Sequence, residues 1–379
     1  MSFILFIAAV IGLNVYDWWK LKRAFLQGHA IGAAVLLVFI LLLLLGPAWM
    51  RPLFSRGNQP RFLVQAYWIW LAWSFWMFVA LILCDIWNLA LLLWQLYVRP
   101  GGTVQWMLGP QGCVWVAIGF VAFGTLWGLV EANAIRLRAV EIASPMVPTE
   151  ANGFKMVLLT DLHLGPAATQ ARMRKVIETA EAAAPDLILS AGDLIDGSSE
   201  RERHLATQLI TLAPPLGKIA VYGNHDVYSG LDFSRDCHKL AGFQLLENQS
   251  AQPTDWLWIY GEKDPASGWH PGYKGEMEAD GGVKAPEGVF RVLLKHRPDV
   301  VKHEGEAPSF DLQLAGHSHG GQIFPFNLLV RLQYKYKEGR LHSLPDGMKL
   351  YVSPGTGVWG PPFRLFARPE ITLFVFRKE

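Results

Sequence analysis

Aspartate, asparagine and histidine side chains recur directly after short apolar runs in the second half of the sequence, in the segments LLTDLHLG, LSAGDL, VYGNHD, LLKH and LAGHSH. Carboxylate, imidazole and amide groups without cysteine form a ligand set that suits Mn, Fe or Zn. The sequence therefore predicts a metal site assembled from distant segments. The potential ligands are Asp161, His163, Asp193, Asn224, His225, His296, His317 and His319.

The order of these segments carries more information than any one of them. A lone Asp-x-His is more often a strand-end turn than a metal site, and a lone Gly-Asp is weaker still. The ordered series GNHD, LLKH and GHSH is hard to obtain by chance. One carboxylate between two groups of ligands can bridge two cations about 3.5–4 Å apart, an arrangement suited to phosphoryl transfer.

The elements that must position these residues follow an alternating pattern. From Phe154 onward, short apolar β-rich runs alternate with longer polar or amphipathic runs, which is the βαβαβα order of a layered α/β domain. After Trp256 most apolar runs are typical of strands, which predicts a second sheet. Sites in open α/β sheets lie outside the carboxyl ends of strands, so separate strand ends can deliver these side chains to one place.

These segments together resemble the motifs of the calcineurin-like metallophosphoesterase family: DLH, GDLID, GNHD, LLKHRPD and AGHSHGGQI. The resemblance covers residues 154–376. The closing VSPGTGVWGPPFRLFARPEI is similar to a membrane-linked branch that has N-terminal transmembrane helices and includes lipid-pathway phosphohydrolases. Where that branch often has G-[VI]-D-D-P, this chain reads GEKDP, which bears on substrate preference. The resemblance implies an α/β metallophosphoesterase domain, a two-sheet sandwich flanked by helices.

The resemblance also implies two divalent metal ions (Mn, Fe or Zn) and their ligands. One ion would be held by Asp161, His163, Asp193 and His319, and the other by Asp193, Asn224, His296 and His317. A hydroxide bridging the two metals would attack phosphorus and cleave a phosphoester or pyrophosphate bond. His225 would donate a hydrogen bond to the phosphoryl oxygens or protonate the leaving oxygen, and Asp226 would orient the His225 ring.

The first third of the sequence has a different character. Residues 1–130 hold 12 of the 16 Trp. A spanning helix needs about 20 mainly apolar residues. Four apolar stretches accordingly predict transmembrane helices at 3–19, 30–49, 62–84 and 111–130, and residues 85–98 either continue the third helix, which we favour, or begin a fifth span. The expected plan is a transmembrane region over 1–131, a linker over 132–153, for which a strand leaving the membrane is also plausible, and a phosphoesterase domain over 154–379.

The charged residues of this region leave its orientation open. Asp85 is a candidate functional group if it lies within the membrane, but solvation at an interface is the favoured interpretation. Basic residues flank the first and second loops and favour opposite orientations. We expect a multi-pass protein of the plasma or inner membrane, with the side of the catalytic domain open. The basic residues are Lys20, Lys22 and Arg23, and Arg51, Arg56 and Arg61.

Three functions stay open on the sequence alone. They are hydrolysis of a lipid-linked phosphoester or pyrophosphate, the same chemistry on soluble phosphodiesters or nucleotides, and a non-catalytic membrane sensor or scaffold. A net charge of +2 without a basic block argues against nucleic acid as the main partner. The stretch GGQIFPFNLLVRLQYKYKEGR interleaves aromatic, aliphatic and basic residues, which suits either a lipid headgroup interface or the packing of a helix or hairpin in the core.

Overall fold

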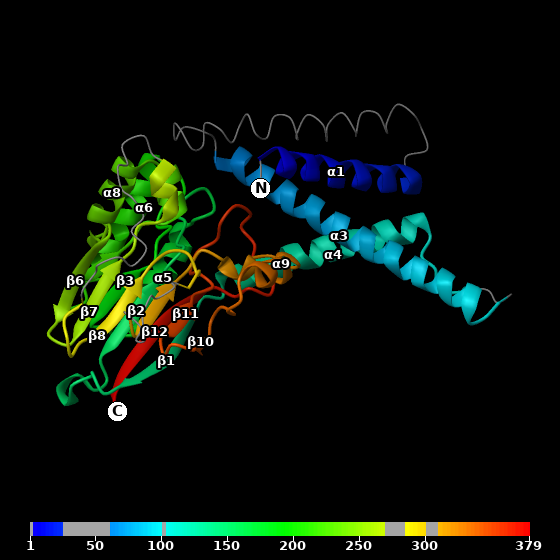
Figure 1. The fold of residues 1–379 in the computed structure, drawn as a ribbon. Coiled ribbons are helices and arrows are strands. Elements are labelled where there is room, and N and C mark those ends of the chain that lie inside the picture. The colour runs from blue at the N-terminus through cyan, green and yellow to red at the C-terminus, as the bar shows by residue number, and fades with distance from the viewer. Residues whose placement is uncertain (1–2, 26–60, 101–103, 270–284, 301–309) are drawn as a thin grey trace. The chain divides into compact units, whose positions relative to one another are not determined.

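The computed structural model describes residues 3–25, 61–100, 104–269, 285–300 and 310–379 (Figure 1). The chain divides into two compact units, and the second unit begins at Leu129, within the last turns of α4. The helices described in the first unit are α1 Phe3–Phe25, α3 Arg61–Tyr97 and α4 Pro110–Asn133.

Two helices among the described residues, α3 and α4, are long and apolar enough to cross a membrane. At 1.5 Å per residue the 37 residues of α3 extend about 55 Å, well beyond the ~30 Å of a bilayer's hydrocarbon core. Residues 85–97 continue the helix that begins at Arg61. The span predicted at 30–49 lies outside the described residues.

Asp85 of α3 has partners within the first unit. Its carboxylate accepts hydrogen bonds from the Tyr16 hydroxyl and from the Lys20 ammonium group, both on α1. The Asp85 side chain is 42% exposed. The sequence favours simple solvation of this residue, whereas the structure gives it an ion pair that joins α1 to α3.

The second unit is built on two six-stranded sheets. The first has the order β1-β12-β2-β3-β4-β5, in which β12 runs antiparallel to β2 and the other neighbours are parallel. Its strands are β1 Arg136–Ser144, β2 Lys155–Leu159, β3 Leu187–Ser190, β4 Lys218–Ala220, β5 Phe243–Leu245 and β12 Glu370–Lys378. The helices that connect them are η2 Thr149–Ala151, α5 Gln170–Ala182, α6 Glu200–Gln208, η3 Leu209–Thr211, α7 Asn224–Tyr228 and α8 Leu231–Leu240.

Strand β1 lies in the segment that the sequence predicts as a linker, residues 132–153. It pairs in parallel with β12 along its whole length, from Arg136 opposite Glu370 to Ser144 opposite Lys378. Most of its residues are only partly buried or exposed, because β1 is an edge strand, and edge strands commonly carry charged side chains. These charges weaken the hydrophobicity pattern of the strand. Of the two alternatives for this segment, the structure has the strand over Arg136–Ser144, which corrects the linker assignment there.

The second sheet has the order β10-β11-β9-β8-β7-β6. The outer pairs β10–β11 and β6–β7 are antiparallel and the inner strands are parallel. Its strands are β6 Gln249–Thr254, β7 Leu257–Gly261, β8 Phe290–Leu294, β9 Leu312–Ala315, β10 Leu341–Ser343 and β11 Lys349–Val352, and its helices are η4 Pro265–Trp269, η5 His319–Gly321 and α9 Phe326–Gln333.

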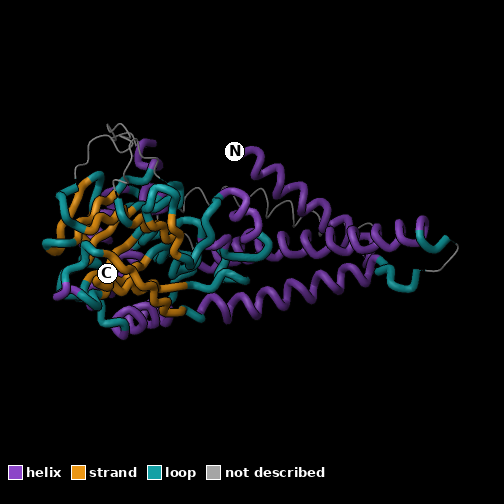
Figure 2. The backbone as a smooth tube through the Cα atoms, turned by 60° about the horizontal axis from the view of Figure 1, so that its bottom comes forward, coloured by secondary structure: helices purple, strands orange, loops and turns teal. Residues whose placement is uncertain are grey.

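The two sheets pack face to face through one apolar cluster. Met156 and Leu158 of the first sheet belong to the same buried cluster as Val292 and Leu312 of the second. Another cluster joins the opposite face of the first sheet to α5, α6 and α8. In Figure 2 the strands lie in the interior of this unit and helices lie around them. The predicted two-sheet α/β sandwich flanked by helices is confirmed.

Candidate metal centre

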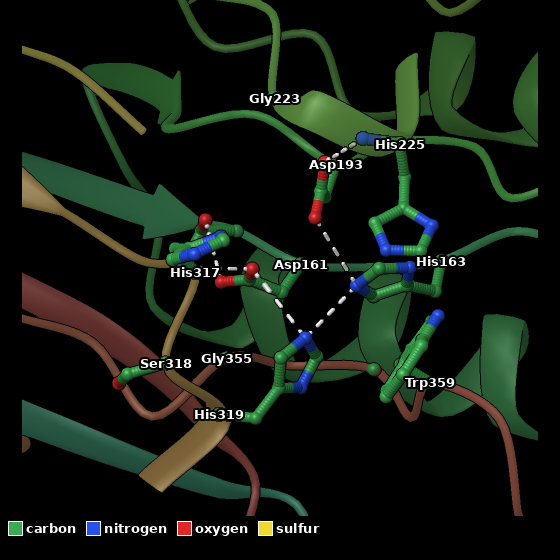
Figure 3. A network of polar contacts seen from close by, with 12 residues as sticks. Asp161, His163, Asp193, Gly223, His225, His317, Ser318, His319, Gly355 and Trp359 are labelled. Atoms are coloured by element: carbon green, nitrogen blue, oxygen red, sulfur yellow. Dashed lines mark hydrogen bonds and ion pairs between the residues drawn. The ribbon is translucent and has the colours of Figure 1, made fainter. Parts of the chain in front are cut away.

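Five parallel strands of the two sheets deliver the predicted ligands. Three of these strands belong to the first sheet and two to the second. In Figure 3 the labelled aspartate and histidine side chains point toward one another. The structure therefore brings the sequence-predicted residues to one place. Asp161 and His163 follow β2, Asp193 follows β3, Asn224 and His225 follow β4, His296 follows β8, and His317 and His319 follow β9.

The first group of donor atoms comes from Asp161, His163 and His319. The Nε2 atoms of His163 and His319 lie 2.9 Å apart, and Asp161 Oδ1 lies 3.5 Å from His319 Nε2. Asp193 Oδ2 lies 3.5 Å from His163 Nε2. The donor atoms of the three residues lie within 4.8 Å of one another, so they can share one metal ion.

The second group lies on the other side of Asp193. His296 Nε2 lies 3.2 Å from Asp193 Oδ2, 3.1 Å from Asn224 Oδ1 and 3.1 Å from His317 Nδ1. Asp193, His296 and His317 also have donor atoms within 4.8 Å of one another. Asp193 is thus the carboxylate that faces both groups.

The backbone at the ligands is strained. Five ligand candidates have φ between +44° and +70°, a region that residues other than glycine rarely adopt. Such residues cost of order 1–3 kcal/mol each and cluster at functional sites. The turns at the strand ends force this conformation, and it aims the side chains inward. The five residues are Asp161, His163, Asp193, His317 and His319.

Gly316, between β9 and His317, leaves no room for a side chain. A Cβ atom there would lie 2.3 Å from Asp161 Oδ2 and 2.4 Å from Thr160 Oγ1. We expect Gly316→Ala to displace Asp161, to weaken metal binding and to destabilise the domain by about 1–3 kcal/mol, as overpacking does. Metal content after dialysis and thermal unfolding measure the two effects.

Gly119→Ala is the control for that substitution, because nothing lies within 4 Å of the added carbon. This variant should retain the metal content of the unaltered protein. Equal metal content in the Gly316→Ala protein would contradict a close fit of Gly316 against Asp161.

Burial and neighbouring charges set the protonation states of the ligand side chains. Burial lowers the pKa of His163 to about 4 and that of His317 to about 3, so both rings are neutral near pH 7. Burial raises the pKa of Asp193, but His296 and His225 outweigh this effect and hold that pKa well below its usual range. Burial lowers the pKa of His296, but the carboxylate of Asp193 outweighs this effect and raises it to about 10, so Nε2 carries a proton that a bound metal ion would displace. His296 Nδ1 donates to Ala191 O at 2.8 Å, which orients the ring.

His225 lies beside the ligand groups and has a carboxylate partner of its own. Its Nδ1 lies 2.9 Å from Asp196 Oδ1, and its backbone N–H donates to Asp193 Oδ1 at 2.8 Å. Burial lowers the pKa of His225, but the carboxylates of Asp196 and Asp193 outweigh this effect and raise it to about 9. The ring is therefore positively charged near pH 7 and can donate a proton.

Asp226 does not orient the His225 ring, contrary to the role predicted for it. Its carboxylate accepts hydrogen bonds from the backbone N–H groups of Asp193 at 2.8 Å, Gly223 at 2.9 Å and Ile195 at 3.2 Å. The side chain is fully buried. Asp226 therefore ties the loop after β3 to the loop after β4 and holds the backbone of Asp193.

Two residues at the site were missed by the sequence analysis. Asp196 is the last residue of GDLID, and its short spacing from Asp193 was the available signal. Arg364 is fully buried; its guanidinium donates to Pro354 O and Ala367 O at 2.8 and 2.9 Å, and Nη2 lies 3.2 Å from His319 Nδ1. No pattern in the sequence connects Arg364 with His319.

The donor set fits two divalent cations. It consists of carboxylate, imidazole and amide groups without a thiolate, all buried except the partly buried His317, and this set suits Mn, Fe or Zn. His163 Nδ1 is buried and has no hydrogen-bond partner within the described parts of the chain. The two groups of donors share Asp193, which is the arrangement that a pair of neighbouring cations requires.

Comparison with known proteins agrees with this architecture. A family model described as calcineurin-like phosphoesterase matches residues 154–321. An uncharacterized metallophosphoesterase of Aquifex aeolicus is 33% identical over 65% of this chain and 94% of its own length. The metallophosphoesterase YkuE of Bacillus subtilis is 32% identical over 72% of this chain and 96% of its own.

A vertebrate relative combines a similar domain with membrane segments. The transmembrane protein with metallophosphoesterase domain of Danio rerio is 31% identical over 69% of this chain, and the match spans 62% of that relative. The two-sheet fold and the shared donor set define a metal-dependent phosphoesterase. The chain belongs to the calcineurin-like metallophosphoesterase family, which uses two divalent metal ions.

Proposed function

We propose that this protein is a membrane-anchored phosphohydrolase with two metal ions at the strand-end site. The observation that supports it is the convergence of donor atoms from five strands on Asp193, which faces both groups of ligands. Asp161, His163, Asp193 and His319 would hold one ion. Asp193, Asn224, His296 and His317 would hold the other.

The metal ions and the protein divide the chemistry between them. When bound, two divalent cations supply Lewis acidity toward the phosphoryl oxygens and an acidified water as nucleophile. His225 donates a hydrogen bond to the phosphoryl group and a proton to the leaving oxygen, and Asp196 keeps its ring oriented and charged. Asp226 acts through the backbone, because it fixes the loop that carries Asp193.

The membrane helices bear on localisation and substrate. α3 and α4 support association with a membrane, and a relative of similar domain is named a transmembrane protein. On this basis we propose a multi-pass protein of the plasma or inner membrane. A protein anchored in this way meets lipid-linked phosphoesters or pyrophosphates at high local concentration. Soluble phosphodiesters or nucleotides are the alternative substrates, in which case the helices serve only to localise the enzyme.

A substrate panel with measured metal content tests this function. The full-length protein in detergent is loaded in turn with Mn, Fe or Zn and assayed on aryl phosphates, aryl phosphodiesters, nucleotides and phospholipid esters. We expect close to two ions per chain and hydrolysis of at least one class. A metal-replete protein that hydrolyses none of them faster than the Asp193→Ala variant would reject the proposal.

A further inference from the structure

Helix α9 exposes apolar side chains and buries a polar one. Leu332 is 85% exposed, Leu329 52%, Leu328 48% and Phe326 41%, whereas Asn327 is buried. A helix that only completed the domain core would show the reverse pattern, with its leucines inside. Contiguous exposed apolar side chains on one short helix mark a surface that contacts a membrane or another protein.

Phe366 extends this surface. It is 57% exposed, and its φ of +59° is one that bulky residues rarely adopt. Phe324, just before α9, contacts the Phe366 ring at 5.8 Å, and its N–H donates to Leu365 O at 3.1 Å. We call these exposed residues the apolar rim: Phe326, Leu328, Leu329, Leu332 and Phe366.

The apolar rim is attached directly to the metal centre. α9 packs on η5, the segment that carries His319, and a Cβ atom at Gly321 would lie 2.4 Å from Asn327 Cα. The side chain of Gln322 accepts from the N–H of Trp359 at 2.8 Å and donates to its carbonyl at 2.6 Å. The Trp359 ring in turn contacts the His225 ring at 5.5 Å (Figure 3).

The apolar rim is also attached to the end of a candidate membrane span. The N–H of Phe366 donates to Glu131 Oε2 at 2.9 Å, and Arg368 Nε donates to Ala134 O at 2.7 Å. Glu131 lies in the last turn of α4, within the second unit. The end of a spanning helix is where lipid headgroups begin.

The charge around the apolar rim fits a bilayer with anionic lipids. Residues 322–337 contain Arg331, Lys335 and Lys337 and no acidic residue, and all three basic side chains are exposed. Basic residues beside inserted apolar ones add electrostatic attraction to anionic headgroups.

We propose that the apolar rim inserts into the interface of the bilayer that holds α3 and α4, and that the metal centre receives lipid phosphoesters from that interface past Trp359. The first statement stands on the exposed surface alone, whereas the second rests on the proposed function. Trp359 is 37% exposed, and its place beside His225 makes it the aromatic surface that a substrate headgroup meets.

Depth measurements on the full-length protein in lipid nanodiscs test the insertion. Leu329→Cys carries an environment-sensitive fluorophore, and Ile210→Cys is the matched control. Both positions are 52% exposed, and Ile210 lies in η3, which leads to the opposite end of β4 from the ligands. The native Cys84, Cys113 and Cys237 are buried, which favours labelling of the introduced thiol.

For a probe in the interface, quenching by lipid-attached nitroxide should be about threefold stronger at position 329 than at 210, with the reverse order for iodide in the water. Equal quenching at both positions would overturn the insertion. A probe at 329 shielded from both quenchers, in a protein that has the mass of a dimer, would overturn it in favour of a contact between two copies.

Kinetics test the substrate statement separately. Leu329→Ser with Leu332→Ser should lower hydrolysis of a phospholipid ester in nanodiscs about tenfold, while hydrolysis of a soluble aryl phosphate changes less than about twofold. Equal losses on both substrates would reject delivery from the bilayer. If the unaltered protein hydrolyses no class of the substrate panel, the proposed function fails; if it hydrolyses other classes but not the phospholipid ester, only delivery from the bilayer is rejected. In both cases the quenching result still decides whether the apolar rim inserts.

Discussion

Asp193→Ala is expected to remove both metal ions and to lower turnover by at least about 10³-fold, because Asp193 is the carboxylate that faces both groups of ligands. The substitution also removes the carboxylate oxygen that lies 3.5 Å from His163 Nε2 and 3.2 Å from His296 Nε2. Metal content per chain and turnover on the best substrate of the panel are measured on the same preparation.

Asp311→Asn is the matched control for Asp193→Ala. Asp311 forms a bidentate ion pair with Arg291 at the start of β9 and is not one of the proposed ligands. This variant should keep two ions per chain and most of its turnover. An Asp193→Ala protein that still binds two ions and turns over normally would contradict the bridging role.

His225→Ala is expected to keep both metal ions and to lower turnover about 10²- to 10⁴-fold, the usual contribution of a positioned acid or base. The loss should depend on the leaving group. A p-nitrophenolate departs without help, so its ester should lose the least, whereas an alkyl ester needs the proton and should lose the most.

Asp196→Asn tests the same proton donation to the leaving oxygen through the carboxylate that contacts His225. The amide keeps a hydrogen bond to His225 Nδ1 but removes the charge that holds the ring protonated. We expect two bound ions and a smaller loss than for His225→Ala, again larger for alkyl than for aryl esters. An equal loss on both kinds of ester would indicate that His225 only binds the phosphoryl group and does not protonate the leaving oxygen.

The ligand positions could be predicted from sequence because parallel strands end at a common edge. Each of the five ligand segments follows an apolar run, and in the structure these runs are the strands β2, β3, β4, β8 and β9. The partner of His225 could not be predicted in the same way. Asp226 is its neighbour in sequence, but Asp226 turns inward to three backbone N–H groups, and the ring faces Asp196 from another loop.

The sequence left strand β1 and the exposed face of α9 each as one of two alternatives, for opposite reasons. β1 carries Arg136, Arg138 and Glu141 at an edge, so it lacks the apolar run that marks a buried strand. The α9 segment has the apolar residues of a core helix but holds them outside. A hydrophobicity pattern records which residues are apolar, and only the fold decides which side they face.

The place of β12 in the first sheet has a consequence for synthesis. β12 lies between β1 and β2, and Arg136 pairs with Glu370 across 234 residues of chain. During translation the apolar helices emerge long before residue 370. The backbone groups of β1 and β2 that pair with β12 stay unpaired until β12 has left the ribosome. Long-range pairing of this kind folds slowly. The nascent domain must therefore stay soluble while β1 follows directly on α4. The first sheet is completed only when β12 inserts between β1 and β2.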